Sequence, residues 1–511
     1  MVSPNGKFAF DVMVYVGKAL FLRCRSEQEI QQELGERNIT ISLREIDRLG
    51  RRFIVYLALA HEQSQEKLKA LMGSRGGYIL HLDGTCEGDS PHLMTSIDEI
   101  SKIVLGNIKL PSENADQLIP FLRTLKRAYG EPIAMVHDMG AAILKAINEV
   151  FPKIPDYICH FHFLKDIGKD LFGHDYSTIR RHLKTHAIRT HLRKTAKGLK
   201  QAIDADPNTL DCLLRYLETK PLHEPKTPLM PLVTTYLIVC WVLEAKQDSH
   251  GFGFPFDRPH FDFYHRAQEA YPDLLALKPN MAGLLPLTPI SKLLADRALA
   301  GTVLRMQEKV RIFDQLREAM RIAQPDSQSG LNDEGDANIQ TIRSRVIAFR
   351  LSSEIEELSA SNIAYRSMIK QIDKYWNKLF ADPIQVATNT GTVTLQPQRT
   401  NNILEQFFRD LKRSNRKRSG YHALSKPLKA MMAQTPLMKN LDNPLYMEII
   451  LNGKATLEER FAAIDIVEIR KVFAQAQEST QRYPKRMAEV FKIRHLSKTL
   501  VDVSGKKAVN S

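Results

Sequence analysis

The stretch "IAMVHDMGAAILKAINEVFP", residues 133–152, joins a strand pattern to a helix pattern, and the fold can be worked out from it. Its beginning is a short, mostly apolar run, which is typical of a strand in a sheet that is covered on both faces. The run ends at Asp138. After it, Ile143, Ile147 and Val150 recur at the spacing of an amphipathic helix. We therefore predict a strand, a carboxylate at its end, and a helix that stops before Pro152.

The flanking segments extend this unit into a larger α/β core. Upstream, "GGYILHLDG" (76–84) is rich in strand-forming residues and reaches Asp83, and two strand-like stretches follow around "HLMTSI" and "KIVLGNIKL". A helix pattern then precedes the opening stretch, and "DYICHFH" (156–162) is predicted as a strand after it. The order of three strands, helix, strand, helix and strand predicts a ribonuclease H-like α/β core. Such a core has a mixed sheet with helices on both faces and is closed by a further helix.

The stretch "RTNNILEQFFRDLKR" (399–413) is predicted as that closing helix. Its apolar residues recur at i, i+3, i+4 and i+7 and form the buried stripe of an amphipathic helix: Leu404, Phe407, Phe408 and Leu411. A second stripe at the edge of the first begins with one acid, Glu405, and continues with bases: Arg409, Lys412 and Arg416. A solvated helix face normally mixes charge signs, so a single carboxylate at the head of a basic row needs an explanation.

Asp83, Asp138 and Glu405 are predicted to converge. The first and fourth strands of the expected sheet are neighbours, so their ends meet at one edge, and a helix packed beside them can supply the third carboxylate. Three converging carboxylates cannot all stay ionised without a cation, and oxygen ligands suit Mg²⁺ or Mn²⁺. Two such ions would activate a hydroxyl for attack on a phosphodiester. Residue by residue a simpler interpretation also holds, because Asp-Gly is a common turn signal and Glu405 fits an exposed helix surface.

Residues 26–56 predict a helix-turn-helix with a basic second helix. Ser26 with Glu29 and Ser42 with Glu45 have the spacing of a capping box, so each pair marks a helix start. The second helix leaves a set of arginines exposed: Arg44, Arg48, Arg51 and Arg52. This pattern is typical of a DNA-binding unit whose second helix enters the major groove. An ordinary helical hairpin has the same outline.

The overall charge and the cysteines indicate the class of partner and the compartment. Lys and Arg number 72 against 58 Asp and Glu, which gives a net charge of +14 and favours nucleic acid ahead of a membrane surface. The five cysteines are scattered, as in a reducing compartment. No apolar run reaches the length of a membrane span, and no signal peptide is evident. We expect a soluble, cytoplasmic protein. Cys159 and His162 have the spacing of half a zinc site, but no second pair matches it, so we expect no zinc.

Three stretches together resemble the catalytic blocks of bacterial DDE transposases of the insertion-sequence and Mutator-like lineage. They are "HLDGT" (81–85), "HDMGAAILKAINEVFP…CHFHFLKDIGKDL" (137–171) and "RTNNILEQFFRDLKRSNRKRSGYH" (399–422). The resemblance covers the core blocks and the order of the domains. These enzymes insert a largely helical domain between the second Asp and the Glu, and the long gap between the blocks matches this.

The resemblance implies a function and roles for individual residues. Asp83, Asp138 and Glu405 would be the catalytic triad that binds two Mg²⁺ or Mn²⁺ ions, and Cys159 and His162 would shape the site. The basic residues of the closing helix would hold DNA phosphates: Arg409, Lys412, Arg413, Arg416, Lys417 and Arg418. The enzyme would cleave transposon ends in double-stranded DNA and transfer the 3′-hydroxyl into target DNA, as a nucleoid-associated homodimer or larger assembly. The rivals are an inactive, transposase-derived DNA-binding regulator and another ribonuclease H-like nuclease.

The expected domains follow from these blocks. They are a helix-turn-helix domain at 1–72, the first part of the catalytic core at 73–170, a mostly helical insertion at 171–382, the last part of the core at 383–430, and a C-terminal helical region and tail at 431–511. Trp241 lies in an apolar run of the insertion. We predict that it packs in a core, rather than stacking on a flipped base as an inserted aromatic does in some enzymes of this type.

Overall fold

The computed structural model describes residues 6–204, 230–245, 250–277, 286–324, 338–479 and 493–505, together with Val2 and a few single positions between these ranges. The chain divides into two compact units. The first unit is formed by Met1–Cys159 and Ala381–Ser511, and the second by His160–Phe380. The predicted insertion, 171–382, overlaps the second unit, which already begins at His160.

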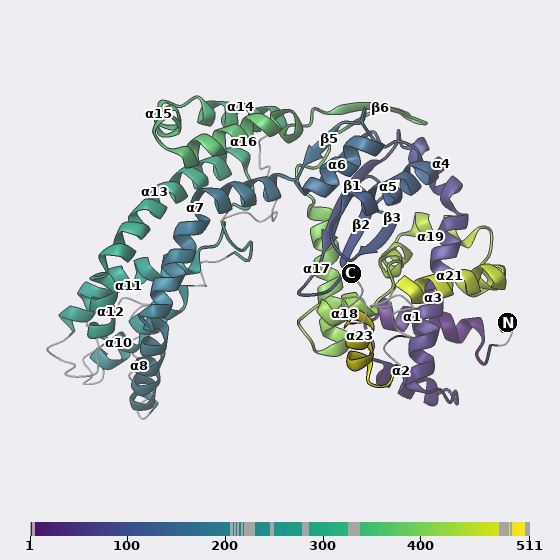
Figure 1. The fold of residues 1–511 in the computed structure, drawn as a ribbon, viewed down its shortest axis with the longest axis horizontal. Coiled ribbons are helices and arrows are strands. Elements are labelled where there is room, and N and C mark those ends of the chain that lie inside the picture. The colour runs from purple at the N-terminus through teal and green to yellow at the C-terminus, as the bar shows by residue number, and fades with distance from the viewer. Residues whose placement is uncertain are drawn as a thin grey trace. The chain divides into compact units, whose positions relative to one another are not determined.

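The first unit contains a five-stranded mixed sheet, a two-stranded hairpin, and helices that precede and follow them (Figure 1). Its elements are α1 (Phe10–Phe21), α2 (Glu27–Gly35), α3 (Leu43–Gln63), α4 (Gln65–Ser74), β1 (Ile79–Thr85), β2 (His92–Asp98), β3 (Val104–Leu110), α5 (Ala115–Tyr129), β4 (Ala134–His137), α6 (Ala141–Val150), β5 (Asp156–Ile158), β6 (Ile384–Thr388), β7 (Gly391–Leu395), α17 (Asn402–Ser419), α18 (Ser425–Ala430), η3 (Thr435–Asp442), α19 (Pro444–Leu451), α20 (Leu457–Ala462), α21 (Ile466–Ser479) and α23 (Leu496–Gly505).

The sheet has the strand order β3-β2-β1-β4-β5. β1 is antiparallel to β2 and parallel to β4, β2 is antiparallel to β3, and β4 is parallel to β5. The predicted mixed α/β architecture is therefore confirmed. β5 is shorter than predicted, because β4 offers partners only as far as His137, whose carbonyl accepts the Cys159 N–H at 2.8 Å. From His160 onward the chain is helical, so the predicted strand over 156–162 is wrong in its second half.

The two faces of the sheet have different partners. Leu80 and Leu82 of β1 belong to the main hydrophobic core, together with buried residues of α3, α5 and α6. The alternate residues of β1 point to the opposite face because side chains alternate along a strand: Ile79, His81 and Asp83. On that face Ile79 packs with β4 and with residues of β6 and β7. The first candidate carboxylate therefore lies on the face opposite the main core.

The N-terminal helices share this main core rather than forming a core of their own. Ser26 makes the predicted capping box with Glu29, and the Ser42 side chain accepts the Glu45 N–H at 3.3 Å, so both helix starts are confirmed. The second helix, α3, is longer than a typical recognition helix and is buried almost all round from Phe53 onward. Its first half and its last two residues, Glu62 and Gln63, are open to solvent. Of its arginines, Arg44 and Arg48 are exposed, and Arg51 and Arg52 are partly buried.

His61 on α3 predicts a pH-dependent loss of stability. It is fully enclosed, with Nδ1 3.0 Å from the Tyr446 hydroxyl and Nε2 3.2 Å from the Leu105 carbonyl, and burial lowers the pKa of His61 to about 4. The folded protein keeps this imidazole neutral, whereas the unfolded chain takes up a proton below about pH 6.5. The protein therefore has its full stability above about pH 6.5. As the pH falls from there through 4, the free energy of unfolding decreases by about 3 kcal/mol. Urea unfolding across this range should show a steeper loss for wild type than for His61→Gln, and equal slopes would contradict the prediction.

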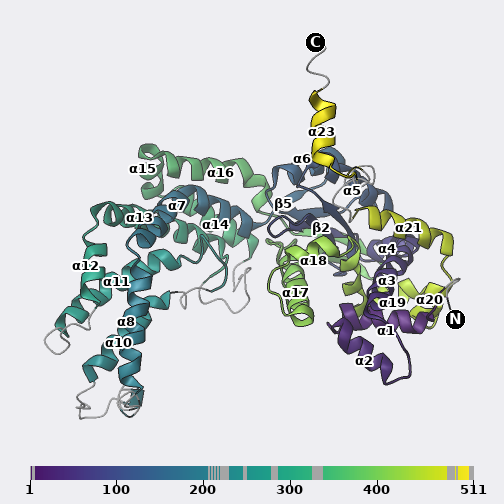
Figure 2. The same cartoon turned by 60° about the horizontal axis from the view of Figure 1, so that its bottom comes forward.

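The regular elements among the described residues of the second unit are all helices. Its elements are α7 (His160–Thr185), α8 (Ile188–Ile203), α10 (Met230–Leu243), α11 (Pro259–Ala276), α12 (Leu287–Leu294), α13 (Arg297–Met320), α14 (Ile339–Arg350), α15 (Ser353–Ser361) and α16 (Ile363–Leu379). α7 and α13 run side by side in both views (Figures 1 and 2). Among the described helices of both units, none has the length and apolar character needed to cross a bilayer.

Trp241 does not pack in a core as predicted. Its side chain is 39% exposed, and the guanidinium carbon of Arg266 lies 4.8 Å from the centre of its ring. Among the described residues α10 contacts α8 and α11, and the residues buried there include Val239 and Val242 but not Trp241.

Candidate metal centre

Asp83 and Asp138 come from neighbouring parallel strands and lie on the same face of the sheet. Leu82 of β1 is opposite His137 of β4, so the next residue on each chain is the aspartate. Residues in register on parallel strands point to the same face. Asp83 is 5% exposed, and Asp138, which directly follows β4, is partly buried. The strand pairing therefore brings the two predicted aspartates to one edge of the sheet.

Glu405 lies in the first turn of α17, which packs on β1 and β2 (Figure 1). The predicted apolar stripe makes this contact. Leu404 and Phe407 are buried, and Phe408 and Leu411 are partly buried against the core. Glu405 follows the deepest of these residues and is partly buried at the edge of the stripe. The predicted helix and its buried face are confirmed.

Asp83 is the electrostatic centre of a cluster of four carboxyls from four segments of the chain. Burial raises the pKa of the Asp83 carboxyl well above its usual range, and the charge of Asp138 raises it further. The N–H of Gly84, which donates to Asp83 Oδ1 at 2.7 Å, lowers it, whereas the charges of Glu405 and Glu113 raise it. Negative charges gathered around a buried carboxyl favour its neutral form or a bound cation.

The predicted triad does not close to contact distance in this structure. Among the described residues, Asp83, Asp138 and Glu405 are not a set whose oxygens all lie within 4.8 Å of one another. Like charges repel, so a wider spacing is what the protein alone should adopt. Two metal ions about 3.5–4 Å apart would share only some of their ligands. Carboxylates that bind only one of the two ions would therefore lie further from one another.

Glu113 is a fourth carboxyl that the sequence patterns did not identify. It lies between β3 and α5, just before the N-cap residue Asn114, where an acid is ordinary because of the helix dipole. Burial raises the pKa of Glu113, and the charge of Asp138 raises it further. An ideal Cβ on Gly140 would lie 2.2 Å from Glu113 Oε1 and 3.1 Å from Asp138 Oδ1. Glu113 and Asp138 can both lie this close to Gly140 because Gly140 has no side chain. This glycine is the one feature of the sequence that relates to the position of Glu113.

Replacing Gly140 with alanine is expected to push the Glu113 carboxylate away from Asp138 without disturbing the fold. The φ of Gly140 is −54°, which suits alanine, and the clash falls on the flexible end of the Glu113 side chain. We expect the free energy of unfolding to change by less than ~1 kcal/mol and the Mg²⁺ affinity to fall ~10–100-fold, as when a group that orients a metal ligand is lost. Calorimetric titration with Mg²⁺ measures this.

The matched control is Gly198→Ala on α8, where no atom lies within 4 Å of the added Cβ. A double variant shows whether Gly140→Ala lowers the Mg²⁺ affinity by displacing Glu113 or in another way. If Gly140→Ala acts through Glu113, adding it to Glu113→Gln should have no further effect on Mg²⁺ affinity. An unchanged affinity in Gly140→Ala would show that Glu113 takes no part in metal binding.

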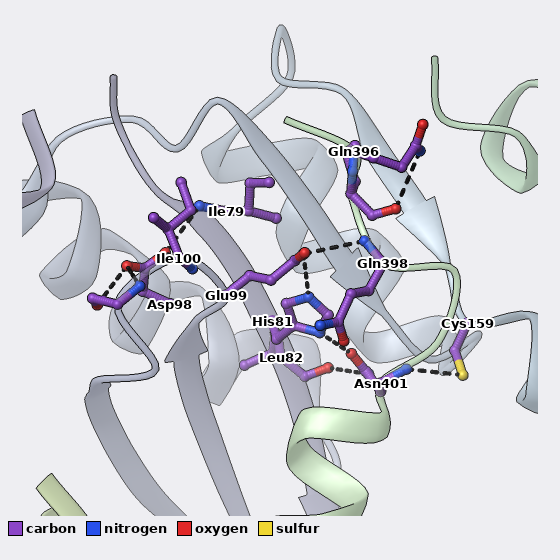
Figure 3. Close-up of polar contacts among 12 residues, drawn as sticks. Ile79, His81, Leu82, Asp98, Glu99, Ile100, Cys159, Gln396, Gln398 and Asn401 are labelled. Atoms are coloured by element: carbon purple, nitrogen blue, oxygen red, sulfur yellow. Dashed lines mark hydrogen bonds and ion pairs between the residues drawn. The ribbon is translucent and has the colours of Figure 1, made fainter. Parts of the chain in front are cut away.

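A buried polar network ties β1 to the start of α17 (Figure 3). Asn401 is the N-cap residue of α17, and its Oδ1 lies 2.8 Å from His81 Nδ1, while its Nδ2–H donates to the Leu82 carbonyl at 3.1 Å. His81 Nε2 lies 2.9 Å from Glu99 Oε2, and the same oxygen accepts the Gln398 N–H at 3.2 Å. The network therefore fixes the chain four residues before Glu405.

The partners of Asn401 determine which of its side-chain atoms faces His81. The Leu82 carbonyl can only accept, so Asn401 must present its NH₂ group to that carbonyl and its oxygen to His81. The two ring nitrogens of His81 thus lie against oxygens of Asn401 and Glu99. His81 is fully buried, and the side chain of Glu99, its partner, is 10% exposed. No sequence pattern indicated this pair.

Cys159 and His162, predicted to shape the site, belong to different units. Cys159 directly follows β5 and is fully buried, and its Sγ accepts the Asn401 N–H at 3.3 Å. It is therefore one more contact that holds the start of α17. His162 lies on α7 in the second unit.

The basic residues of α17 extend from Glu405 toward the end of the helix. Five of them are exposed: Arg409, Lys412, Arg413, Arg416 and Lys417. Arg418 is partly buried, and its charge acts on Glu27 of α2.

On α3, Arg48 lies 3.5 Å from Glu45 and Arg51 lies 3.0 Å from Asp47, so part of that helix's charge is already paired. On α17 one of the five exposed bases, Arg413, lies 3.9 Å from Asp410, and this longer row is the stronger candidate for contact with a polyanion.

No protein-family model matches the chain, and no curated protein matches its sequence. The geometry and chemistry of the chain itself therefore carry the functional proposal.

Proposed function

We propose that this chain is a DDE-type DNA transposase whose active site is the acidic cluster around Asp83. One observation carries the proposal: carboxyls from β4's end, the β3–α5 connection and α17 all act on a single buried aspartate of β1. Such a cluster does not stabilise the fold, because every added negative charge makes the ionised aspartate more costly. A divalent cation that binds the carboxylates explains why they are gathered.

The strand order supports the same proposal at the level of the fold. A sheet of order β3-β2-β1-β4-β5, with the first three strands antiparallel and β1, β4 and β5 parallel, has the order expected for a ribonuclease H-like core. A helical unit occupies the chain between β5 and α17, where transposases of the insertion-sequence and Mutator-like lineage carry an insertion. Fold alone does not establish function, so the acidic cluster is the main argument.

In the proposed site Asp83, Asp138 and Glu405 bind the metal, with Glu113 as a fourth acid. Two Mg²⁺ or Mn²⁺ ions, when bound, activate an attacking hydroxyl and stabilise the leaving oxygen of a phosphodiester. The chain's basic residues hold the substrate. The exposed row on α17 contacts phosphates next to the carboxylates, and such contacts position DNA without reading its sequence. Arg44 and Arg48, at the open end of α3, supply a further contact with the backbone.

The proposed reaction has two steps. Hydrolysis of a phosphodiester at the transposon end leaves a 3′-hydroxyl, and this hydroxyl then attacks a phosphodiester of the target DNA. Each step exchanges one P–O bond for another, so no external energy source is needed. Two ends must be cut and joined together, which makes a homodimer or larger assembly on double-stranded DNA the expected working state.

The test is cleavage of a supercoiled plasmid that carries the DNA flanking the gene, in the presence of Mg²⁺ or Mn²⁺. Wild type is expected to cut at the ends of the element and to join the 3′-hydroxyls to a second plasmid. Glu405→Gln should lose at least ~100-fold in rate, because a metal ligand is worth more than the groups that orient it. Asp410→Asn is the control, since Asp410 is half-exposed on the same helix.

Each rival function has its own outcome in this experiment. Binding of the flanking DNA without cleavage by wild type would indicate a DNA-binding regulator. Preferential cleavage of RNA–DNA hybrids or DNA junctions would indicate another ribonuclease H-like nuclease. Full activity of Glu405→Gln would remove Glu405 from the site whichever substrate is cut.

A further inference from the structure

A second cluster of metal-ligating side chains lies in the helical unit. His182 is near the end of α7, and His186 follows one turn later, with its N–H still bonded to the His182 carbonyl at 2.9 Å. Residues four apart on a helix lie on the same face. Asp296, the N-cap residue of α13, lies opposite them, because α7 and α13 run side by side (Figures 1 and 2).

The three side chains are already close to the spacing that a metal needs. Asp296 Oδ2 lies 2.8 Å from His182 Nδ1 and 3.0 Å from His186 Nε2, and the three ligand atoms all lie within 4.8 Å of one another. Ligands around a tetrahedral zinc, with bonds of about 2.0–2.1 Å, are roughly 3.3 Å apart. Each His–Asp pair would need to open by only a few tenths of an ångström.

The carboxylate is held ionised and in a fixed orientation. Its second oxygen, Oδ1, accepts the Leu299 N–H at 3.0 Å at the start of α13. Burial by itself would raise the pKa of the Asp296 carboxyl, but hydrogen bonds from His186, the Leu299 N–H and His182 lower it well below its usual range. The side chains of Asp296, His182 and His186 are 18%, 24% and 25% exposed, so solvent and ions can reach them.

We propose that His182, His186 and Asp296 bind a zinc ion that joins the end of α7 to the start of α13. Two imidazoles and a carboxylate form a ligand set that zinc uses when a fourth position stays open to water. This set is softer than the all-oxygen cluster around Asp83, which suits Mg²⁺. In the metal-free protein each histidine donates its N–H to Asp296. Zinc would take the place of the proton on each of these two nitrogens.

The zinc site is independent of the proposed transposase activity. The expectation of no zinc rested on the isolated Cys159–His162 pair. The new cluster joins two histidines four residues apart to Asp296, which is 110 or more positions further along the chain, so local spacing does not reveal the full ligand set.

The experiment is a calorimetric titration of the full-length, chelator-stripped protein with Zn²⁺, in excess Mg²⁺ to occupy the acidic cluster. Wild type is expected to bind one tight equivalent of zinc and to melt at a higher temperature with zinc than without. His182→Asn and His186→Gln place an amide N–H where the donor nitrogens lie, so they keep the hydrogen bonds to Asp296 but lose the imidazole ligand. Each should weaken zinc binding by ~100-fold or more while melting like wild type without metal.

Two further variants make the outcome decisive. Asp296→Asn keeps the N-cap, because Asn caps as well as Asp, but loses the charged ligand, so it too should lose tight zinc binding. His174→Gln, an exposed histidine of α7, is the control and should bind zinc like wild type. Equal zinc affinity in wild type, His182→Asn and His186→Gln would overturn the proposal and leave the cluster as a hydrogen-bonded link. Tight binding of Ni²⁺ or Cu²⁺ with none of Zn²⁺ would overturn the assignment to zinc.

Discussion

Replacing Asp83 with asparagine is expected to abolish metal-dependent DNA cleavage and to make the metal-free protein more stable at neutral pH. Asparagine has the same shape and keeps the oxygen that accepts the Gly84 N–H at 2.7 Å. It removes the negative charge, which is a metal ligand in the proposed function and a source of repulsion without the metal. We expect the cleavage rate to fall ~10³-fold or more, because groups that merely orient a ligand are already worth ~10–100-fold.

The stability effect follows from the direction of the pKa shift. Burial, and then the charge of Asp138, raise the pKa of Asp83 in the folded protein above its ordinary value of 3.8, and Glu405 and Glu113 also face it. The folded state therefore favours the protonated carboxyl. The protonated Asp83 carboxyl contributes its full stabilisation below about pH 3.8. This stabilisation is lost as the pH rises through the raised pKa of Asp83. At neutral pH wild type bears the cost of ionising Asp83, whereas Asp83→Asn does not.

Urea unfolding in the presence of a chelator, from acid to neutral pH, measures this difference. The advantage of Asp83→Asn should grow as the pH rises, and added Mg²⁺ should reverse the order because it binds only the folded wild type. Asp89→Asn is the control, since Asp89 is 71% exposed and pairs with Lys429 at the surface. A metal-free Asp83→Asn that is less stable than wild type would contradict the argument that the cluster is electrostatically strained.

The parts of the site that could be predicted are those with a local pattern. Asp83 and Asp138 follow buried strand runs whose order in the chain implies that they pair, and the stripe of Leu404 and Phe407 shows which side of α17 is buried. Glu113 has no such pattern, because its place depends on the path between β3 and α5 and on its close approach to Gly140. Periodicity determines which residues face the core, but it does not determine where an irregular connection passes.

The N-terminal helices show the same limit at the level of packing. The capping residues predicted the starts of α2 and α3 correctly, because a cap is a contact between residues three apart. That α3 continues into the main core could not be predicted. Its Phe53 and Tyr56 lie 5.7 and 5.4 Å, between ring centres, from Phe461 of α20. A contact between residues some four hundred positions apart produces no pattern in the local sequence. The sequence around α3 therefore could not distinguish a helix that packs in the core from one that contacts DNA.

Replacing His81 with leucine is expected to cause a larger loss of stability than any other single change in the first unit considered above. His81 is fully buried between Asn401 Oδ1 at 2.8 Å and Glu99 Oε2 at 2.9 Å. Leucine would leave the Glu99 carboxylate buried without its partner and the Asn401 oxygen without a donor. Removing the donor to a buried acceptor costs about 1–3 kcal/mol for each group, and more when the acceptor is charged. His81→Gln, which can restore one of the two hydrogen bonds, should lose less.

A second substitution shows whether the cost comes from the stranded charge. Adding Glu99→Met to His81→Leu removes the unpaired carboxylate, so the double variant should regain much of the lost stability in urea unfolding. Cleavage should not recover with it, because the hydrogen bond from His81 that helps to hold Asn401 at the start of α17, and hence Glu405, stays broken. Equal stability of His81→Leu and wild type would contradict a stabilising role for the hydrogen bonds of His81. Recovery of both stability and cleavage in the double variant would mean that the network stabilises the fold but does not position Glu405.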